Sequence, residues 1–512
     1  MCLKERLSVI IVILSVVLLI GPSFYNTSTP NHSPSLFENT GSSIAQSTFT
    51  VFSDEILLST VDALYNHHVE PTLAISDNGT IFAGWKNSET HNGGGAQVSF
   101  TKSVDGGETW ESPRDVTNFE GRITRKSDPW LVWHNDIIYY AYLEFTVSGD
   151  FSQITVAKSS DYGATWSEAA ASHGSYFADK ETMVVADNGT IFVAYDDIDT
   201  EESGLATVRL TRSVDGGNSF DEVSVIAEPS DGHVGPYLTL DNESNVFVCW
   251  TYLMEEGGNL FLDNSTDFGL TFGEERFVNS DGNYADFTTS VDGRPAKTTL
   301  PVIRFDSYNR LYCLWADTFD PVSRSFDVYL RFSDDFGFTW SDRILINSQT
   351  EGDQWMPDLD IDSEDNLHIV YYSELFGLYK PYYHKVIIGG GNREYMKIGK
   401  GYALTDISTF ANFTRPGDYF TVRTDSNNLP HVVWTDGRDN EMDIYYAHQI
   451  VYDYTETETT TTSTTSNPSS TISTTTSTTV AVDLIPILVG GVAGLSLTLV
   501  IALLLLRKKD FS

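Results

Sequence analysis

Positive charge is scarce in this chain of 512 residues. It contains 31 Lys and Arg residues against 71 Asp and Glu residues, which gives a formal net charge of −40. A surface this acidic repels nucleic acid and anionic lipid headgroups, because both are polyanions. We therefore expect no nucleic-acid partner and no electrostatic attachment to a membrane surface.

Cysteine is nearly absent, since the chain has three: Cys2, Cys249 and Cys313. Cys249 precedes Trp250 by one residue, whereas Cys313 precedes Trp315 by two. The two thiols should therefore point to opposite faces of equivalent strands. On that geometry we expect buried free thiols and no disulfide between them, so that stability must come from the core.

Long apolar runs are confined to the two ends of the chain. At the N-terminus, Lys4 and Arg6 precede an apolar stretch over residues 7–20, which has the length of a signal-peptide core. This pattern predicts a signal peptide over residues 1–24, followed by a polar linker over 25–47. No Ala-x-Ala cleavage motif follows the apolar stretch, so an uncleaved anchor is the alternative.

At the C-terminus, residues 484–506 carry no charge and are long enough to cross about 30 Å of hydrocarbon. A basic cytoplasmic tail over 507–512 follows, as the positive-inside tendency requires. We predict one transmembrane helix there, preceded by a Thr/Ser-rich stalk over 454–480 that has little to bury. The chain would then be a single-pass protein of the cell membrane with a large extracellular N-terminal part.

Glycosylation is expected in an exported chain of this kind. N-x-S/T sequons occur at seven positions, although such triplets also arise by chance. They are Asn26, Asn31, Asn78, Asn188, Asn242, Asn264 and Asn412.

A repeated unit fills the region between these ends. Each copy has an apolar strand, a turn rich in Asp, Asn and Gly, and a second strand that ends in an aromatic residue. Such turns suit hairpins, because Asn, Asp and Gly tolerate positive φ. The copies are residues 71–85, 129–142, 181–195, 236–250, 301–315, 357–371 and 417–434.

Five units are followed by a third strand and an octet, Ser-x-Asp-x-Gly-x-(Thr/Ser)-aromatic. The Asp carboxylate can accept backbone N–H bonds of a turn, Gly supplies positive φ, and the aromatic should anchor the next strand in the core. The octets cover residues 103–110, 159–166, 213–220, 265–272 and 333–340, and their carboxylates are Asp105, Asp161, Asp215, Asp267 and Asp335.

The octets resemble the Asp box, or BNR repeat, of the sialidase superfamily, and the resemblance spans about residues 50 to 453. It implies an all-β propeller over residues 48–453, with blades of four antiparallel strands and a box between the third and fourth strands. In that family the box is structural, so it speaks for the fold and not for an activity.

The number of blades follows from the seven units, one for each blade. The last blade lacks a fourth strand within 442–452, but residues 52–59 copy the pattern of the fourth strand at 340–347. We therefore predict seven blades closed by an N-terminal strand, which removes open sheet edges. Six blades, as in sialidases proper, is the alternative.

Sialidase activity in this superfamily implies three Arg residues on a substrate carboxylate, a Tyr nucleophile with a Glu, and an Asp acid/base. The Arg-Ile-Pro motif of the first Arg is missing, and the nearest string, residues 121–124, lacks the Pro. Four other Arg residues lie near unit starts, where pairing with the many carboxylates is the simpler interpretation: Arg125, Arg304, Arg415 and Arg423. No catalytic residue is therefore assigned.

A ligand of a propeller would bind at the mouth of the central funnel, beside the starts of the innermost strands. Carboxylates mixed with a few cations could bind sugar hydroxyls, or Ca²⁺. They could equally cap strands around a solvated channel. No calcium loop is present, so no cofactor is predicted. The mouth residues are Glu70, Arg125, Asp128, Asp179, Lys180 and Asp418.

Three functions remain open at this point. The first is a surface-anchored recognition protein that binds glycans or another surface protein. The second is an exo-sialidase-like or other glycoside hydrolase with a rearranged pocket. The third is a structural envelope protein. The missing Arg motif favours the first over an enzyme.

Overall fold

The computed structural model describes most of the predicted propeller region and parts of its flanks. The described residues are 45–59, 65–89, 95, 97–116, 125–148, 151–172, 177–200, 203–221, 224–230, 232–254, 257–279, 290–291, 294–295, 300–317, 326–349, 351–376, 378–389, 395–406, 416–438, 441–465 and 473–486. The chain forms two compact units, Ser47–Tyr454 with Asp483–Ser512, and Met1–Gln46 with Thr455–Val482.

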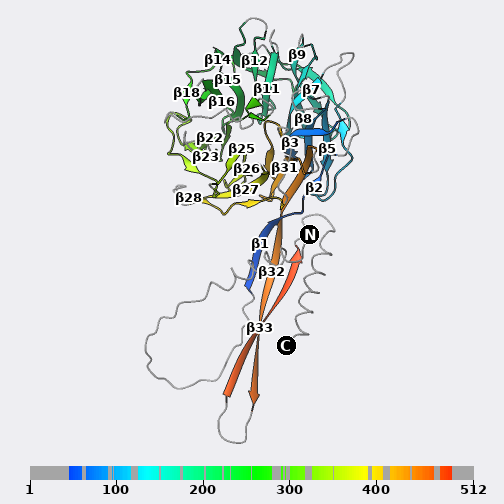
Figure 1. The fold of residues 1–512 in the computed structure, drawn as a ribbon, viewed down its shortest axis with the longest axis vertical. Helices are drawn as coiled ribbons and strands as arrows, with labels where there is room; N and C mark the ends of the chain where they lie inside the picture. The colour runs from blue at the N-terminus through cyan, green and yellow to red at the C-terminus, as the bar shows by residue number, and fades with distance from the viewer. Residues whose placement is uncertain are drawn as a thin grey trace. The chain divides into compact units, whose positions relative to one another are not determined.

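The first unit is a seven-bladed β-propeller built from antiparallel sheets (Figure 1). Blade one contains β3 (His67–Ile75), β4 (Ile81–Ser88), β5 (Gln97–Ser103) and β6 (Arg114–Asp115); blade two contains β7 (Arg125–His134), β8 (Ile137–Phe145), β9 (Ser152–Ser159) and β10 (Ser167–Ala170); and blade three contains β11 (Phe177–Val185), β12 (Ile191–Ile198), β13 (Ala206–Ser213) and β14 (Ser224–Ser230). Blade four contains β15 (His233–Leu240), β16 (Val246–Met254), β17 (Gly257–Ser265) and β18 (Arg276–Phe277), and blade five contains β21 (Val302–Phe305), β22 (Leu311–Asp317), β23 (Asp327–Ser333) and β24 (Ile344–Leu345). Blade six contains β25 (Asp353–Ile361), β26 (Leu367–Leu375), β27 (Leu378–Gly389) and β28 (Tyr395–Ile398), with β29 (Tyr402–Ala403) also on β27, and blade seven contains β30 (Thr421–Thr424), β31 (Pro430–Asp436) and β32 (Asp443–Thr465) with β2 (Ile56–Leu57) and β1 (Ala45–Phe52). A separate short hairpin pairs β19 (Ser290–Val291) with β20 (Arg294–Pro295).

The blades close into a ring through their first strands. These strands contact one another in the order β3, β7, β11, β15, β21, β25 and β30, and β30 contacts β3 again. The prediction of seven blades is therefore confirmed, and the six-bladed alternative is wrong. Each predicted unit forms the first two strands of its blade.

The core lies between the blades. The aromatic residue that ends each unit lies on the second strand and is at most 1% exposed, which makes these side chains the largest contributors of buried apolar area. They are Trp85, Tyr142, Tyr195, Trp250, Trp315, Tyr371 and Trp434.

The octets form the turn after the third strand, as the Asp and Gly pattern predicts. In blade four, Asp267 Oδ1 accepts the backbone N–H groups of Leu270 at 3.1 Å and Thr271 at 2.9 Å, and Oδ2 accepts the Thr271 hydroxyl at 2.6 Å. In each of the other four octets, the residue four positions after the Asp likewise donates its backbone N–H and its hydroxyl to the Asp carboxylate. Each carboxylate thus satisfies its own turn.

The glycines of the octets also join neighbouring blades. Gly269 has φ +77°, and a Cβ there would overlap Leu210 of blade three. Gly337, with φ +85°, stands in the same relation to Leu262 of blade four. Glycine is required at these positions both for the left-handed backbone and for the close approach.

The closing aromatics of the octets differ from expectation. Only Phe220 is buried, at 7% exposure, and the other four are half-buried. All four pack against the edges of core clusters. Two of them contact a ring of a neighbouring blade: Trp110 lies 4.8 Å from Tyr446 of blade seven, and Trp166 lies 5.3 Å from Phe100 of blade one.

The N-terminal strand closes blade seven, as predicted. Ile56 pairs with Tyr446 and Leu57 with Tyr445 of β32. Ser59 extends the seam, because its hydroxyl donates to Asp443 at 2.8 Å and accepts the Ile444 N–H at 3.0 Å. The last blade therefore contains both ends of the propeller sequence.

The two termini are only partly described. The predicted signal peptide and most of the linker lie outside the described residues, as do residues 487–512. Leu484, Ile485 and Pro486 end strand β33 (Ser473–Pro486), which pairs with β32, so the predicted helix does not begin at Leu484. Thr- and Val-rich sequence favours an extended backbone at that point. No helix in the described part of the chain has the length and hydropathy of a membrane span.

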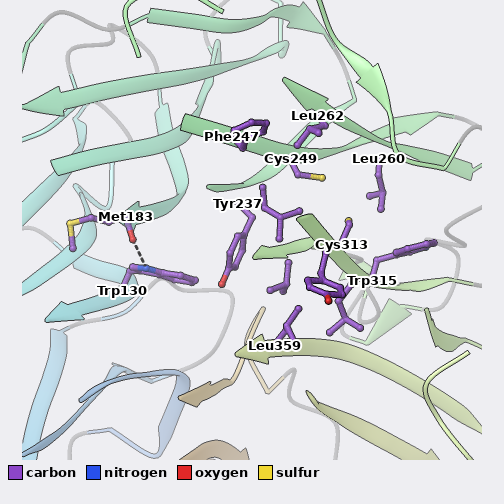
Figure 2. Close-up of a cluster of buried hydrophobic side chains, with 14 of the residues drawn as sticks. Trp130, Met183, Tyr237, Phe247, Cys249, Leu260, Leu262, Cys313, Trp315 and Leu359 are labelled. Carbon is purple, nitrogen blue, oxygen red and sulfur yellow. Dashed lines mark hydrogen bonds between the residues drawn. The ribbon is translucent and has the colours of Figure 1, made fainter. Parts of the chain in front are cut away.

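Cys249 and Cys313 are free and fully buried, as predicted. The expectation that opposite faces keep them apart is wrong. They lie in adjacent blades of a ring, where one face of a blade packs against the opposite face of the next blade. Both thiols belong to one apolar cluster (Figure 2).

Candidate functional site

The innermost strands share an irregularity at their N-terminal ends. The pairing of first and second strands shifts in register in five blades, between residues 69 and 72, 127 and 130, 179 and 182, 234 and 237, and 355 and 358. One residue in each shift has positive φ: Glu70, Asp128, Lys180, Gly235 and Met356. A β-bulge of this kind re-aims side chains locally. Its recurrence makes it part of the blade design.

Three bulges and the segment before β30 bring predicted mouth residues from four blades together. Lys180 Nζ donates to Asp128 Oδ1 at 2.8 Å and also pairs with Asp418. Glu70 Oε2 accepts the Asp128 backbone N–H at 3.2 Å. Glu70 Oε1 lies 3.4 Å from Lys86 Nζ on β4 of the same blade. Glu70, Asp128 and Asp418 are at most 5% exposed, so the cluster is a buried ionic network.

Charges within this cluster divide the carboxyl groups. Burial alone would raise the pKa of Asp128, but the ammonium groups of Lys180 and Lys86 and two hydrogen bonds hold it below the usual value. Burial raises the pKa of Glu70, and the negative charge on Asp128 adds to the effect. Of Asp128 and Glu70, Asp128 is therefore the one that holds the negative charge.

Three of these carboxylates satisfy the distance criterion for a metal site. Ligand oxygens of Glu70, Asp128 and Asp418 lie within 4.8 Å of one another. The Lys180 ammonium is already among them, and Ca²⁺ takes six to eight oxygen ligands. The donor set fits an internal ammonium better than a divalent cation, because a metal here would have to displace Lys180.

The other two predicted mouth residues lie beside the cluster. Asp179 is half-buried, accepts the Lys180 backbone N–H at 3.0 Å and pairs in register with Asp196 of β12. Arg125 begins β7 opposite Phe145 and is half-buried. The contacts above therefore bring together Glu70, Asp128, Lys180 and Asp418, with Asp179 next to Lys180 in the chain.

A small cavity of about 40 Å³ lies at the centre of the ring, which is room for about three water molecules. Residues of six blades line it. Aromatic rings form part of its wall: Trp130 and Tyr237 lie 5.4 Å apart, edge to face, and Tyr419 lies 5.9 Å from Trp130. The Trp130 indole donates to the Met183 carbonyl at 3.0 Å, which fixes the ring orientation (Figure 2). Lys180 and Asp418 also reach this wall.

Two polar side chains of this wall have no hydrogen-bond partner among the described residues. Glu181 is 2% exposed and both its carboxyl oxygens are unpaired, and the Tyr237 hydroxyl is unpaired at 5% exposure. Burial raises the pKa of Glu181 well above the usual value, with the negative Asp128 as a further cause. Burial also raises the pKa of Tyr237 to about 12. Buried polar groups are normally satisfied, so these two are the groups of the wall that can bond to water or to a ligand in the cavity.

Asp196 adds a third such group behind the wall. Its Oδ2 accepts the Gly235 N–H at 2.8 Å, whereas Oδ1 has no partner among the described residues. Burial raises the pKa of Asp196 to about 8, against a smaller lowering by the Gly235 bond. Asp196 is therefore largely protonated at neutral pH.

Two of the four arginines considered from the sequence lie beside the cavity wall. Arg423 pairs with Asp358 at 3.0 Å and lies 5.9 Å from the Trp130 ring centre; Arg304 lies 3.9 Å from Asp360. These pairs agree with the interpretation that the arginines neutralise carboxylates. Arg415 lies outside the described residues.

Sequence reasoning missed Glu181, Tyr237 and Trp130. A signal for Glu181 was present, because it occupies the first position of a unit at which five other units carry Pro. Tyr237 and Trp130 occupy the next position, where the units vary. That variation marks the position that faces the cavity.

Comparison with known proteins gives structural neighbours only. No protein-family model and no curated protein matches the chain. Solved structures to which it is similar include Trypanosoma rangeli sialidase in complex with sialic acid (14% identity, TM-score 0.43, 66% of this chain and 58% of that one) and the NanB sialidase from Streptococcus pneumoniae (12%, 0.43, 77% and 70%). Another is an alpha-L-arabinofuranosidase from Fusarium graminearum (12%, 0.42, 77% and 97%). The neighbours thus include members of the superfamily that the octets resemble, but at these identities and scores they assign no activity.

Proposed function

We propose that this chain is a carbohydrate-binding propeller whose ligand docks at the mouth of the central cavity and places hydroxyl groups in it. One observation carries the proposal: Glu181 and Tyr237 place unpaired, buried polar atoms on a wall that also contains aromatic rings. A sugar offers hydroxyl groups for the polar atoms and C–H faces for the rings. A surface-exposed recognition protein of this type was also the leading interpretation of the sequence.

The charge around the cavity narrows the class of sugar. Lys180 pairs with Asp128 and Asp418, Lys86 pairs with Glu70, and the nearby Arg423 pairs with Asp358. These cations are already paired with carboxylates, so an anionic sugar would have to compete for them, whereas a neutral or amino sugar would not. We therefore propose neutral or cationic glycans as ligands, above sialic acids.

Binding to an array of neutral, amino and acidic glycans tests this proposal, followed by titration calorimetry on the best ligand. Y237F and E181Q each remove or alter one unpaired polar group and should weaken binding about 10-fold. E243Q is the matched control, because Glu243 lies exposed in a hairpin turn, and it should bind as wild type. Absence of binding to every glycan would contradict the proposal and favour the structural envelope role.

A second candidate function is glycoside hydrolysis. The observation in its favour is that the pKa of Glu181 is raised, whereas the pKa of the nearby Asp128 is lowered. A proton donor and an ionised carboxylate are the two groups that this reaction commonly needs. The absence of the Arg-Ile-Pro motif places hydrolysis second.

Release of 4-methylumbelliferone from a panel of glycosides tests hydrolysis. If the chain is a hydrolase, E181Q should lower kcat at least about 100-fold without loss of the folded state. Turnover that survives E181Q unchanged would exclude Glu181 as the proton donor. No turnover on any substrate, with glycan binding intact, would leave a binding protein.

Anchoring at the cell surface is part of the proposal and is supported by the sequence of both termini. In this proposal the octets are Asp boxes with a structural role, and exposed sequons such as Asn78 and Asn188 carry glycans. A cavity at the end of a stalk would then be presented to ligands outside the cell, including glycans of another surface protein.

A further inference from the structure

Two buried thiols face each other across the interface between blades four and five. Cys249 lies on β16 opposite Leu262 of β17, and Cys313 lies on β22 opposite Ile303 of β21. Both are 0% exposed. Burial raises the pKa of the Cys249 thiol, and the nearby Cys313 thiol adds to this effect. Figure 2 shows both side chains directed into the space between the two strands.

Neighbouring contacts support the orientation of these faces. Phe247, two residues before Cys249 and on the same face of β16, lies 4.8 Å from the ring of Phe305 in blade five. Phe305 pairs in register with Leu311, two residues before Cys313 and on the same face of β22. The faces that carry the two thiols therefore pack against each other.

We propose that Cys249 and Cys313 are a disulfide site that joins blades four and five when the chain folds under oxidising conditions. Each thiol loses its hydrogen and one S–S bond forms. The two electrons and two protons pass to a disulfide-bearing oxidant, which is reduced to two thiols. The geometry stands by itself, whereas an oxidising compartment rests on the export proposed above.

The pair must react before the two blades pack tightly. Thiolate is the reactive form, and burial raises the pKa of the Cys249 thiol well above its usual value. Once the ring has closed, the thiols are also shielded from any oxidant. The bond would restrain a loop that contains the octet at 265–272 and the first hairpin of blade five.

The full-length chain with Cys2→Ser provides the test, because it leaves only these two thiols. It is refolded from the reduced, denatured state in a glutathione redox buffer, then denatured and alkylated. We expect no alkylation at either cysteine, a linked peptide pair lighter by about 2 Da than its reduced parts, and a thermal midpoint about 5 °C above that of the reduced protein. C249A/C313A in the same background should show no response to oxidant.

Two alkylatable thiols after refolding in oxidising buffer, or only intermolecular disulfides, would overturn the proposal. Alkylation of the protein taken directly from its own cells tests the compartment separately. Paired thiols there would support export. Free thiols there, with pairing in vitro, would contradict export and leave the disulfide site standing.

Discussion

Carboxyl groups of one chemical type behave differently in this molecule because their surroundings differ. Asp267 is half-buried at a turn whose N–H and hydroxyl groups all donate to it, which lowers its pKa to about 2. Asp128 is buried, but Lys180 keeps it ionised. Asp196 and Glu181 are buried without a cation in contact, and their pKa values are raised. The residue scale therefore decides which acids hold a proton at neutral pH.

The raised pKa of Asp196 predicts a pH dependence of stability. Its folded pKa of about 8 exceeds the ordinary value of 3.8, so the folded state binds the proton more tightly. The contribution of Asp196 is fully present below about pH 4 and is lost as the pH rises through about 8, with a slope of at most about 1.4 kcal/mol per pH unit.

Urea unfolding of wild type and D196N between pH 5 and 9 measures this dependence. D196N keeps an acceptor for the Gly235 N–H and cannot ionise, so its stability should fall less steeply with pH, and it should exceed wild type near pH 9. Asp187 is exposed in a hairpin turn, so D187N should follow wild type. Parallel curves for D196N and wild type would contradict the assignment.

The octet carboxylate predicts a local loss of stability. Asp267→Ala removes the acceptor of two backbone N–H groups and one hydroxyl, and we expect the free energy of unfolding to fall by about 1–2 kcal/mol. Thr266→Ala, at an exposed position of the same octet, should leave stability within about 0.5 kcal/mol of wild type. Equal effects of the two variants would show that the carboxylate does not hold the turn.

At the scale of elements, the hairpin is the repeated unit. The strand that completes blade seven comes from the chain before the first repeat. Leu58, at 3% exposure, packs in a core cluster with Leu73 of blade one and Ile444 of blade seven. Leu57 next to it is 45% exposed. The strand therefore presents one anchoring side chain and one solvent-facing side chain in adjacent positions.

This alternation offers a matched test of ring closure. L58A should lower the free energy of unfolding by about 2–4 kcal/mol, because it leaves a cavity between the first and last blades. L57A should change it by no more than about 0.5 kcal/mol. Denaturant midpoints of the two variants compare them directly. If both variants lose equally little stability, the strand closes the ring through its backbone alone.

At the scale of the whole molecule, attachment to a membrane is the remaining prediction. Residues 484–506 carry no charge, so we expect the full-length protein to stay with the membrane fraction after alkaline carbonate washing. Two lysines placed in this stretch, L497K and V500K, should release it, since each costs about 3 kcal/mol at a helix centre. Two lysines in the stalk, T474K and T476K, are the control and should leave it attached. Release of the unaltered protein by carbonate would contradict the anchor.

Most of the fold could be predicted from local sequence patterns. Seven hairpin units and five octets recur because each satisfies its own turn with Asp, Asn and Gly, and this needs no distant contact. The residues proposed for the mouth could be named for the same reason, since the start of each innermost strand is visible as the start of a unit. Their role in binding a ligand stays a prediction.

Repetition predicted seven equal units with one strand missing at the end and one spare at the beginning, and the resemblance of the octets to the Asp box implied that the sheets form a ring. Which groups meet was decided by the tertiary structure. Lys180 lies between Asp128 and Asp418 because blades far apart in sequence converge at the axis. Cys249 meets Cys313 because adjacent blades turn opposite faces toward each other. Strand period sets the face of a side chain, but only the arrangement of blades around the axis sets what that face contacts.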